Sequence, residues 1–262
     1  MECVDRHKLW LSSNGEEGQR LVLADLSLQD RSDFTNRNWD GYDLTDADLS
    51  GMVAESITMR HCNLTRCVMN NVQLKDCRMM FCNLFQVSMV SGTVSGGHFE
   101  FVNFSQSIVE NVRFEHCYFS SCNMFEVLFS QCEVRLAAFY RVNMIKTQWN
   151  YSKLELVTMR WVSAYSSIFF CTEMPDLEAL DSGFSVSIFQ DCTMPRSMKD
   201  GYAEGTSFIN CECVGLDLSG TTADQSLVAY CDMSDAVIDS DKINGLRFYN
   251  SFMPKSLEDF CE

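Results

Sequence analysis

The sequence predicts an all-β solenoid whose backbone repeats every five residues, and two periodic series of residues predict it. The first series takes every fifth residue from Leu44 to Met174, and none of its 27 members is polar. The second series lies two residues before each of these centres and consists mostly of small residues, such as Ala47, Cys62 and Gly92. Neither the 3.6-residue period of a helix nor the two-residue period of a simple strand gives this spacing. The backbone therefore has to return to one orientation every five residues.

Short local motifs connect this pattern to a known repeat. They are Ala47-Asp48-Leu49, Cys62-Asn63-Leu64, Cys82-Asn83-Leu84 and Cys122-Asn123-Met124. Over residues 32–253 the chain resembles the pentapeptide-repeat family, whose consensus is roughly Ala-(Asp/Asn)-Leu-x-x. The resemblance implies a right-handed quadrilateral β-helix with four pentapeptides per coil and about ten coils. In that fold the large centre and the small residue two before it point inward, and the other three positions point outward.

Stacking the sequence at 20 residues per coil is consistent with this expectation. One interior column reads Met59, Met79, Phe99, Phe119, Phe139 and Met159. Another reads Leu44, Leu64, Leu84, Phe104, Met124 and Met144. Side chains of similar shape thus lie above one another, as coils stacked about 4.8 Å apart require.

The repeat divides the chain into five parts. Residues 1–31 are expected to cap one end, since a solenoid cannot leave its apolar ends open. The β-helix is expected over 32–194 and again, in a shifted register, over 206–253. Residues 195–205 separate the two registers, and a loop or phase break is predicted there. Residues 254–262 form a short amphipathic tail that could cap the other end.

Charge and composition exclude several classes of partner. The net charge is −16, and it is divided as −6 over residues 1–60, +1 over 61–174 and −11 over 175–262. Direct binding to nucleic acid needs clustered Lys and Arg, so DNA and RNA are not expected as ligands. The same balance argues against an anionic membrane, and no apolar stretch is long enough to span one.

The cysteines predict a reducing compartment. Of the 14, ten fall on inward small positions, where they act as small apolar residues rather than as disulfides or metal ligands. The N-terminus carries charges and does not read as a secretory signal. We therefore expect a cytoplasmic protein, in the bacterial cytosol or, if the chain is injected, in the cytosol of a host.

The sequence offers little that could carry catalysis. Its four histidines are dispersed, and Cys211-Glu212-Cys213 lacks a third ligand at a suitable spacing. No dinucleotide, phosphate-loop or nucleophile-elbow motif occurs. We predict no catalytic residue, no metal, no cofactor and no enzymatic activity.

The outward positions of one face are more informative. A structural ladder of asparagines is expected there: Asn63, Asn83, Asn103, Asn123 and Asn143. Beside it lie large apolar residues, which are predicted to bind a partner protein: Phe81, Phe85, Phe101, Phe125, Ile145, Trp161 and Tyr165. A contiguous exposed aromatic patch usually marks an interface, although these side chains could instead be covered by another part of the chain.

Three functions follow as hypotheses. The first is a protein-binding scaffold, an immunity-type or effector-type module that docks on or sequesters a protein as a monomer or weak dimer. The second comes from the resemblance, because some family members mimic duplex DNA and bind DNA gyrase. The acidic charge agrees with mimicry, whereas the neutral middle of the rod weakens it. The third is that the chain is the β-helix portion of a secreted effector.

Overall fold

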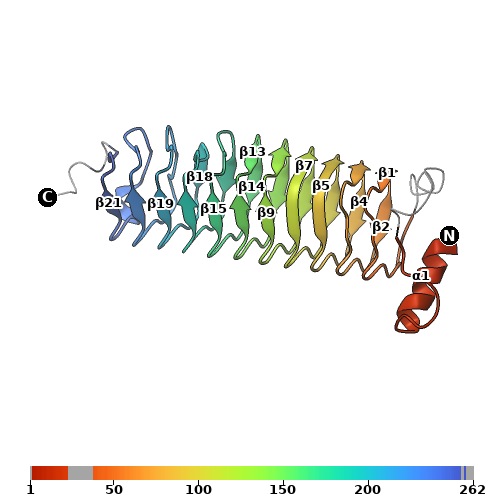
Figure 1. Cartoon of the computed structure of the whole chain (residues 1–262). Coiled ribbons are helices and arrows are strands. Elements are labelled where there is room, and N and C mark those ends of the chain that lie inside the picture. The colour runs from red at the N-terminus through yellow and green to blue at the C-terminus, as the bar shows by residue number, and fades with distance from the viewer. Residues whose placement is uncertain (1, 23–37, 255–256, 258–262) are drawn as a thin grey trace.

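The five-residue period becomes one side of a four-sided coil, and the coils stack into a straight rod (Figure 1). The structure is a computed structural model that describes residues 2–22, 38–254 and 257. Each coil pairs in parallel with the next through strands of mostly three residues. The predicted all-β helix of about ten turns is thereby confirmed.

Two parallel sheets run the length of the rod. The 13-stranded sheet contains β1 (Val53–Glu55), β3 (Gln73–Lys75), β5 (Ser88–Ser95), β7 (Ile108–Glu115), β9 (Leu128–Ser130), β10 (Glu133–Arg135), β12 (Gln148–Asn150), β13 (Lys153–Glu155), β15 (Ile168–Phe170), β17 (Ile188–Gln190), β19 (Ser207–Ile209), β20 (Leu227–Ala229) and β21 (Arg247–Tyr249). The 8-stranded sheet contains β2 (Thr58–Arg60), β4 (Arg78–Met80), β6 (His98–Glu100), β8 (Tyr118–Ser120), β11 (Ala138–Tyr140), β14 (Thr158–Arg160), β16 (Glu178–Leu180) and β18 (Ser197–Lys199).

Three of the four long faces of the rod differ in the chemistry of their outward side chains. The asparagine face carries Asn63 and its equivalents in successive coils, which are joined by isolated parallel bridges. The arginine face is the outer surface of the 8-stranded sheet. The ion-pair face carries β3, β10 and β13, where oppositely charged side chains alternate between coils. Along most of the rod, the corner between two faces is a residue with φ near +55°, a left-handed conformation placed two residues after a centre.

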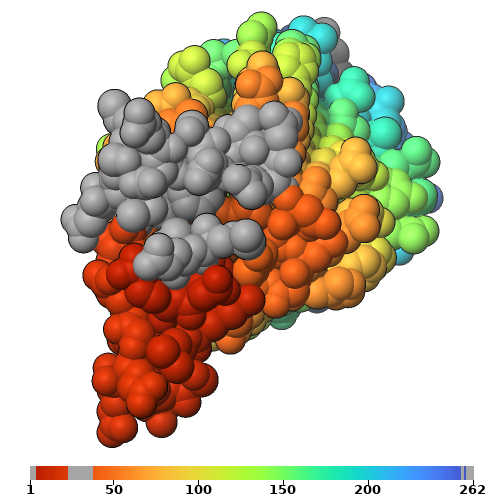
Figure 2. Space-filling model, turned by 90° about the vertical axis from the view of Figure 1, so that its right-hand side faces the viewer, coloured from red at the N-terminus to blue at the C-terminus, as the bar shows by residue number. Residues whose placement is uncertain are grey.

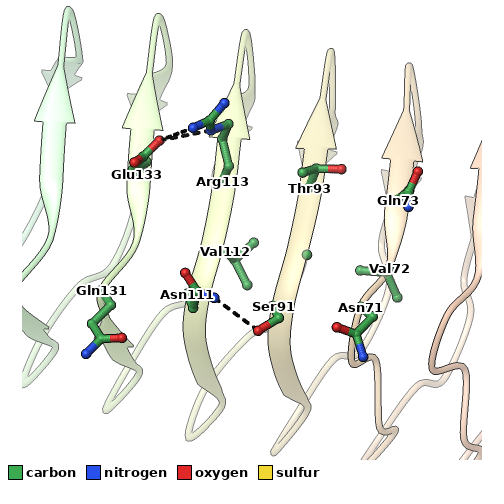
Figure 3. Close-up of a pocket in the computed structure, with 11 residues that line it drawn as sticks. Asn71, Val72, Gln73, Ser91, Thr93, Asn111, Val112, Arg113, Gln131 and Glu133 are labelled. Atoms are coloured by element: carbon green, nitrogen blue, oxygen red, sulfur yellow. Dashed lines mark hydrogen bonds and ion pairs between the residues drawn. The ribbon is translucent and has the colours of Figure 1, made fainter.

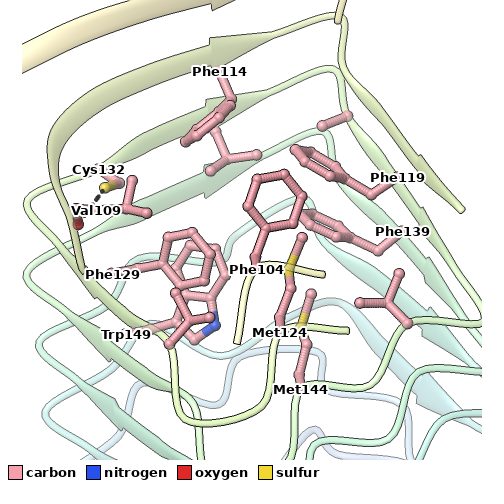
Figure 4. Packing of buried hydrophobic residues seen from close by; sticks show 14 of the residues in the cluster. Phe104, Val109, Phe114, Phe119, Met124, Phe129, Cys132, Phe139, Met144 and Trp149 are labelled. Atoms are coloured by element: carbon pink, nitrogen blue, oxygen red, sulfur yellow. Dashed lines mark hydrogen bonds between the residues drawn. The ribbon is translucent and has the colours of Figure 1, made fainter. Parts of the chain in front are cut away.

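The interior is a column of stacked apolar side chains (Figure 4). Phe119 lies between Phe99 and Phe139, with ring centroids 4.8 Å apart on both sides. The Trp149 ring stacks on Phe129 at 3.9 Å. Because equivalent residues repeat at the spacing of the coils, each ring contacts the same kind of ring above and below it. The void that remains among these residues has a volume of about 20 Å³.

The inward small positions share one hydrogen bond, which explains the residues that occupy them. Cys67 Sγ donates to the carbonyl of Leu44, 23 residues earlier, at 2.9 Å, and Ser167 Oγ makes the equivalent bond to Met144 at 2.7 Å. A thiol or hydroxyl here satisfies a backbone carbonyl without adding bulk. All ten cysteines predicted to point inward are buried and free, so their structural interpretation is confirmed.

Of the two alternatives predicted for residues 195–205, a loop or a phase break, the structure has a phase break and no looped-out segment. These residues contain β18, whose buried Met198 pairs with Ala179. Coil neighbours are 20 residues apart up to the pair Glu173 and Thr193. They are 19 apart from the pair Glu178 and Ser197 to the pair Thr193 and Glu212, and 20 apart again from the pair Ser197 and Asp217. The side of the coil that holds Pro195 and Arg196 is therefore one residue short. This single omission produces the shifted register and leaves the coil intact.

The N-terminal segment packs on the first coil. Helix α1 (Glu2–Ser12) buries Val4 and His7, and Figure 2 shows it projecting beyond one corner of the rod. Leu21 accepts a hydrogen bond from the Asp48 backbone at 2.8 Å and is itself buried. Residues 2–22 thus pack against the first coil, whereas residues 1 and 23–31 of the predicted cap lie outside the described residues. In the C-terminal tail, Leu257 is buried, and residues 255, 256 and 258–262 are outside the described part.

Candidate functional site

The predicted asparagines form a continuous hydrogen-bonded ladder along the asparagine face. The Nδ2 of each donates to the Oδ1 of the asparagine one coil earlier, with a distance of 3.4 Å from Asn83 to Asn63 and 2.9 Å from Asn103 to Asn83. The next two bonds, from Asn123 and from Asn143, measure 3.0 and 2.9 Å. The ladder is half-buried, so these amides contribute to the rigidity of the face and offer little to a ligand.

The ladder also fixes the backbone of its apolar neighbours. Each Oδ1 accepts the backbone N–H two residues later, which belongs to Phe85 at 3.3 Å, to Phe125 at 3.3 Å and to Ile145 at 3.0 Å. This is an Asx turn, in which the side chain replaces a backbone acceptor. The three apolar side chains are half-buried, and Tyr165, in the same column, is 48% exposed. They form a line along one margin of the face.

The other predicted aromatic residues occupy the opposite margin, at a corner of the coil. Phe81, Phe101 and Trp161 have φ of 54°, 53° and 54° and are 49%, 49% and 41% exposed. A left-handed conformation costs roughly 1–2 kcal/mol in a residue with a Cβ, and Asn, Asp and Gly tolerate it best. The chain therefore places large rings where smaller residues would suit the backbone better.

Two separate clusters form at this corner rather than one continuous patch. The ring of Phe81 stacks between His61 and Phe101, with centroids 5.2 and 5.0 Å apart. Trp161 lies further along the rod, beyond Ser121 and Arg141 at the same corner. The seven predicted residues thus share one face, but they lie on two margins with the asparagine ladder between them.

Sequence reasoning missed the residues that surround Trp161. Tyr140 meets its ring edge to face at 4.9 Å, and the guanidinium of Arg141 lies 5.3 Å from its centroid and 5.2 Å from that of Tyr140. The guanidinium of Arg160 lies 4.7 Å from the Trp161 centroid. The signal for this cluster was present in the sequence, because residues 20 apart at the same corner are neighbours. The aromatic pattern alone does not reveal the cluster, because the cations Arg141 and Arg160 are not part of that pattern.

A shallow groove lies at another corner, where β5 and β7 continue from one side of the coil to the next (Figure 3). Its volume is about 590 Å³, and Gly92 and Val112 lie in its floor, where a Cβ on Gly92 would come within 3.0 Å of the Val72 carbonyl. Asn111 donates to Ser91 Oγ at 3.1 Å, and Arg113 pairs with Glu133 at 2.6 Å. Its two charged side chains are thus paired with each other.

Among residues 2–22, 38–254 and 257, no three His, Cys, Asp or Glu side chains lie close enough together to hold a metal ion. Cys211 and Cys213 are both buried. No helix within the same residues combines the length and the apolar character needed to cross a membrane.

Comparisons with known proteins address the fold. No curated protein matches the chain. Among solved structures, full-length QnrB1, "a plasmid-mediated fluoroquinolone resistance protein", is 9% identical, with 82% of this chain and 92% of that chain covered and a TM-score of 0.46. HetL from Nostoc sp. strain PCC 7120, described as involved in heterocyst differentiation regulation, is 13% identical, with coverage of 85% and 91% and a TM-score of 0.42. At these values neither assigns a function to this chain.

A model described as "Pentapeptide repeats (8 copies)" matches residues 43–80. The coil that those residues build continues beyond them, with the same left-handed corners, to Asn250. The chain therefore carries pentapeptide repeats, and its fold is the β-helix that the resemblance implied.

Proposed function

We propose that this chain is a non-enzymatic scaffold that binds a partner protein through the asparagine face and its aromatic margins, as an immunity-type or effector-type module. The observation that carries the proposal is the exposure of Phe81, Phe101 and Trp161 at left-handed corners. Most corners of the coil have this conformation, and at these three the chain places a large exposed ring where a smaller residue would suit the backbone better. Large exposed aromatic residues are the side chains that contribute most to protein interfaces.

The form of the molecule supports binding rather than catalysis. The interior is filled by side chains, and the groove beside β5 and β7 is shallow and internally paired. A flat, rigid face made of short strands suits recognition of another surface, because little conformational entropy is lost when it binds. The 12 cysteines from Cys62 to Cys231 are free thiols, which supports a reducing cytosol, of a bacterium or of a host.

The test is affinity capture with the tagged protein, read by mass spectrometry. The substitutions Phe85→Ser, Phe125→Ser and Trp161→Ser are combined in one variant. The control variant carries Val53→Ser, Leu156→Ser and Val214→Ser, which remove exposed apolar side chains elsewhere on the rod. We expect the aromatic variant to lose a protein that the wild type and the control both capture. Equal capture by all three, with the fold unchanged, would refute the proposal.

DNA mimicry is the second candidate, and the net charge of −16 is the observation that favours it. A mimic would bind DNA gyrase or a topoisomerase in competition with duplex DNA, and the complex would weaken with salt. The arginines around Trp161 oppose this reading, because they place positive charge in the middle of the rod. Capture of gyrase subunits that added DNA displaces would favour mimicry over the scaffold.

A third possibility is that the chain is the β-helix portion of a secreted effector, in which case the same face would serve to dock the effector on its target. The capture experiment distinguishes the two settings by the origin of the protein that is retained. A protein from the same cell supports an immunity-type role, whereas a host protein supports an effector-type role.

A further inference from the structure

Positive charge is concentrated on one side of this acidic rod. From β2 to β14 and along the adjoining corner to Trp161, the arginine face carries four arginines, Arg60, Arg78, Arg141 and Arg160, and a single acid, Glu100. The chain as a whole carries 36 acidic and 20 basic residues, so this surface reverses the overall balance.

The arginines of this face differ from the other cations in their pairing. On the ion-pair face, Arg113 meets Glu133 at 2.6 Å and Lys75 meets Glu55 at 2.7 Å. On the arginine face, Arg160 lies 3.5 Å from Asp181, whereas Arg60, Arg78 and Arg141 have no carboxylate partner within the described part of the chain. A surface that leaves three guanidiniums without a counter-charge is arranged for an anion that comes from outside.

The Trp161 cluster prepares one of these guanidiniums for binding. Arg141 lies over both Tyr140 and Trp161, and its φ of 53° places it at the corner. An aromatic face holds a guanidinium through its π electrons and leaves the N–H groups at the edge of the cation available. Those N–H groups match the two oxygens of a carboxylate. Arg141 is thereby fixed in position before a ligand arrives.

The spacing of the cations sets the length of the ligand. Arg78 lies on β4, and Arg160 lies on β14, four coils further along. At about 4.8 Å per coil this separation is about 19 Å, which an extended peptide of about six residues covers. Between the two ends lie His98 and Tyr118, whose ring centroids are 4.9 Å apart. The middle of the site therefore suits apolar or small polar side chains.

We infer that the arginine face binds an extended acidic segment of the partner protein, with carboxylates near Arg78 at one end and near Arg141 and Arg160 at the other. This inference rests on the proposed function, because it names the chemistry of the partner that the neighbouring aromatic margin would also contact. The negative charge over the rest of the rod repels an acidic segment and so directs it to this face.

The test measures the binding of labelled peptides by fluorescence anisotropy. The acidic probe is Glu-Glu-Phe-Ser-Phe-Ser-Glu-Glu, and a matched probe carries Gln in place of every Glu. We expect the acidic probe to bind the full chain about tenfold or more tightly than the Gln probe, and to weaken as salt is raised. Equal binding of the two probes, or binding of neither, overturns the inference.

Two charge-reversal variants locate the site. Arg78→Glu combined with Arg141→Glu changes the arginine face, and Lys75→Glu combined with Arg113→Glu changes the ion-pair face by the same net charge. The first variant should lose about tenfold or more in affinity for the acidic probe, and the second should retain the affinity of the wild type. An equal loss in both variants would show a general charge effect and would also overturn the inference.

Self-association and failure of the proposed function give different results. If the occupant is the acidic C-terminal part of a second copy, sedimentation velocity will show dimers of the wild type that Arg78→Glu/Arg141→Glu abolishes, and a separate partner is then excluded. If the scaffold function is wrong, the triple-serine aromatic variant will capture the same proteins as the wild type. If only the inference is wrong, that variant will lose its partner while the charge-reversal variant keeps it.

Discussion

Asn143 donates a hydrogen bond from its Nδ2 to Oδ1 of Asn123, one coil earlier, at 2.9 Å. The same Oδ1 accepts the backbone N–H of Phe125 at 3.3 Å, and Asn123 itself donates to Asn103 at 3.0 Å. One half-buried amide therefore joins three coils and orients the backbone of an exposed aromatic margin. The rigidity of the proposed binding surface depends on this ladder.

The substitution Asn123→Ala should lower the free energy of unfolding by about 1–3 kcal/mol, because it removes the three hydrogen bonds that join this side chain to Asn103, Phe125 and Asn143. Chemical denaturation followed by circular dichroism measures this change. Asn150→Ala is the control, since the Asn150 side chain makes no hydrogen bond within residues 38–254, and it should change stability by less than about 0.5 kcal/mol. Equal effects of the two substitutions would contradict a role for the ladder.

Gly201 should tolerate no side chain. A Cβ at this position would lie 2.2 Å from the backbone carbonyl oxygen of Ser182, and a backbone atom cannot move away cheaply. Gly201→Ala should therefore destabilise the protein by about 1–3 kcal/mol or more. Gly183→Ala is the matched control, because the nearest atom to its added Cβ is 4.0 Å away, and it should be close to neutral. Thermal unfolding of both variants checks the difference, and a stable Gly201→Ala protein would argue against this packing.

The N-terminal cap should loosen in mild acid. Burial lowers the pKa of His7 from its ordinary value of 6.5 and is the largest effect. The negative charge of Asp43 raises this pKa, and the positive charge of Arg20 lowers it by a smaller amount. Below about pH 6.5, His7 binds a proton more readily in the unfolded chain than in the folded protein, so the free energy of unfolding decreases as the pH falls. Protonation of Nδ1 also breaks its hydrogen bond from the Leu21 backbone N–H, which measures 3.1 Å.

The protection factor of the Leu21 amide in hydrogen exchange reports on this cap. It should fall between about pH 7.5 and about pH 5.5 in the wild type. His7→Asn keeps an acceptor that does not titrate, so its protection factor should be independent of pH over this range. His116→Asn, which changes an exposed corner residue, should behave as the wild type does. A pH dependence that survives in His7→Asn would assign the effect to another group.

Thiol reactivity should be confined to one of the cysteines between residues 38 and 254. Burial raises the pKa of Cys67, Cys77, Cys117 and Cys122 to about 12 and that of Cys132 to about 11. Cys171, at a corner, is the one described cysteine that is not buried. The thiolate is the reactive form of a cysteine, and burial keeps the reagent away from the other cysteines between residues 38 and 254. Iodoacetamide should therefore label Cys171 first in the native protein. Peptide mapping by mass spectrometry tests this, and equally rapid labelling of Cys67 would contradict it.

Much of the fold could be predicted because inward positions obey a local rule. The centres from Leu44 to Met174 and the small residues before them are set by the five-residue period, and all ten inward cysteines are buried. The register change near Pro195 could also be located. Its form could not be predicted, because a loop and a side of the coil shortened by one residue produce the same shift in the sequence.

The candidate surface was predicted only in part. Phe85, Phe125 and Tyr165 share a column because they are multiples of 20 residues apart, and that relation can be read from the repeat. The grouping of Arg141 and Arg160 around Trp161 depends on side-chain directions at a left-handed corner and on contact between neighbouring coils. Neither follows from the period alone.

The sequence by itself determined which side chains point inward, how many residues make a coil and therefore that the molecule is a rod. Those properties depend on local spacing, and burial of apolar side chains enforces them in every coil. The tertiary structure decided which outward side chains meet. It paired the cations of the ion-pair face with carboxylates and left three of the four arginines of the arginine face without them among the described residues, because the geometry between adjacent coils, about 20 residues apart in the chain, selects the partners.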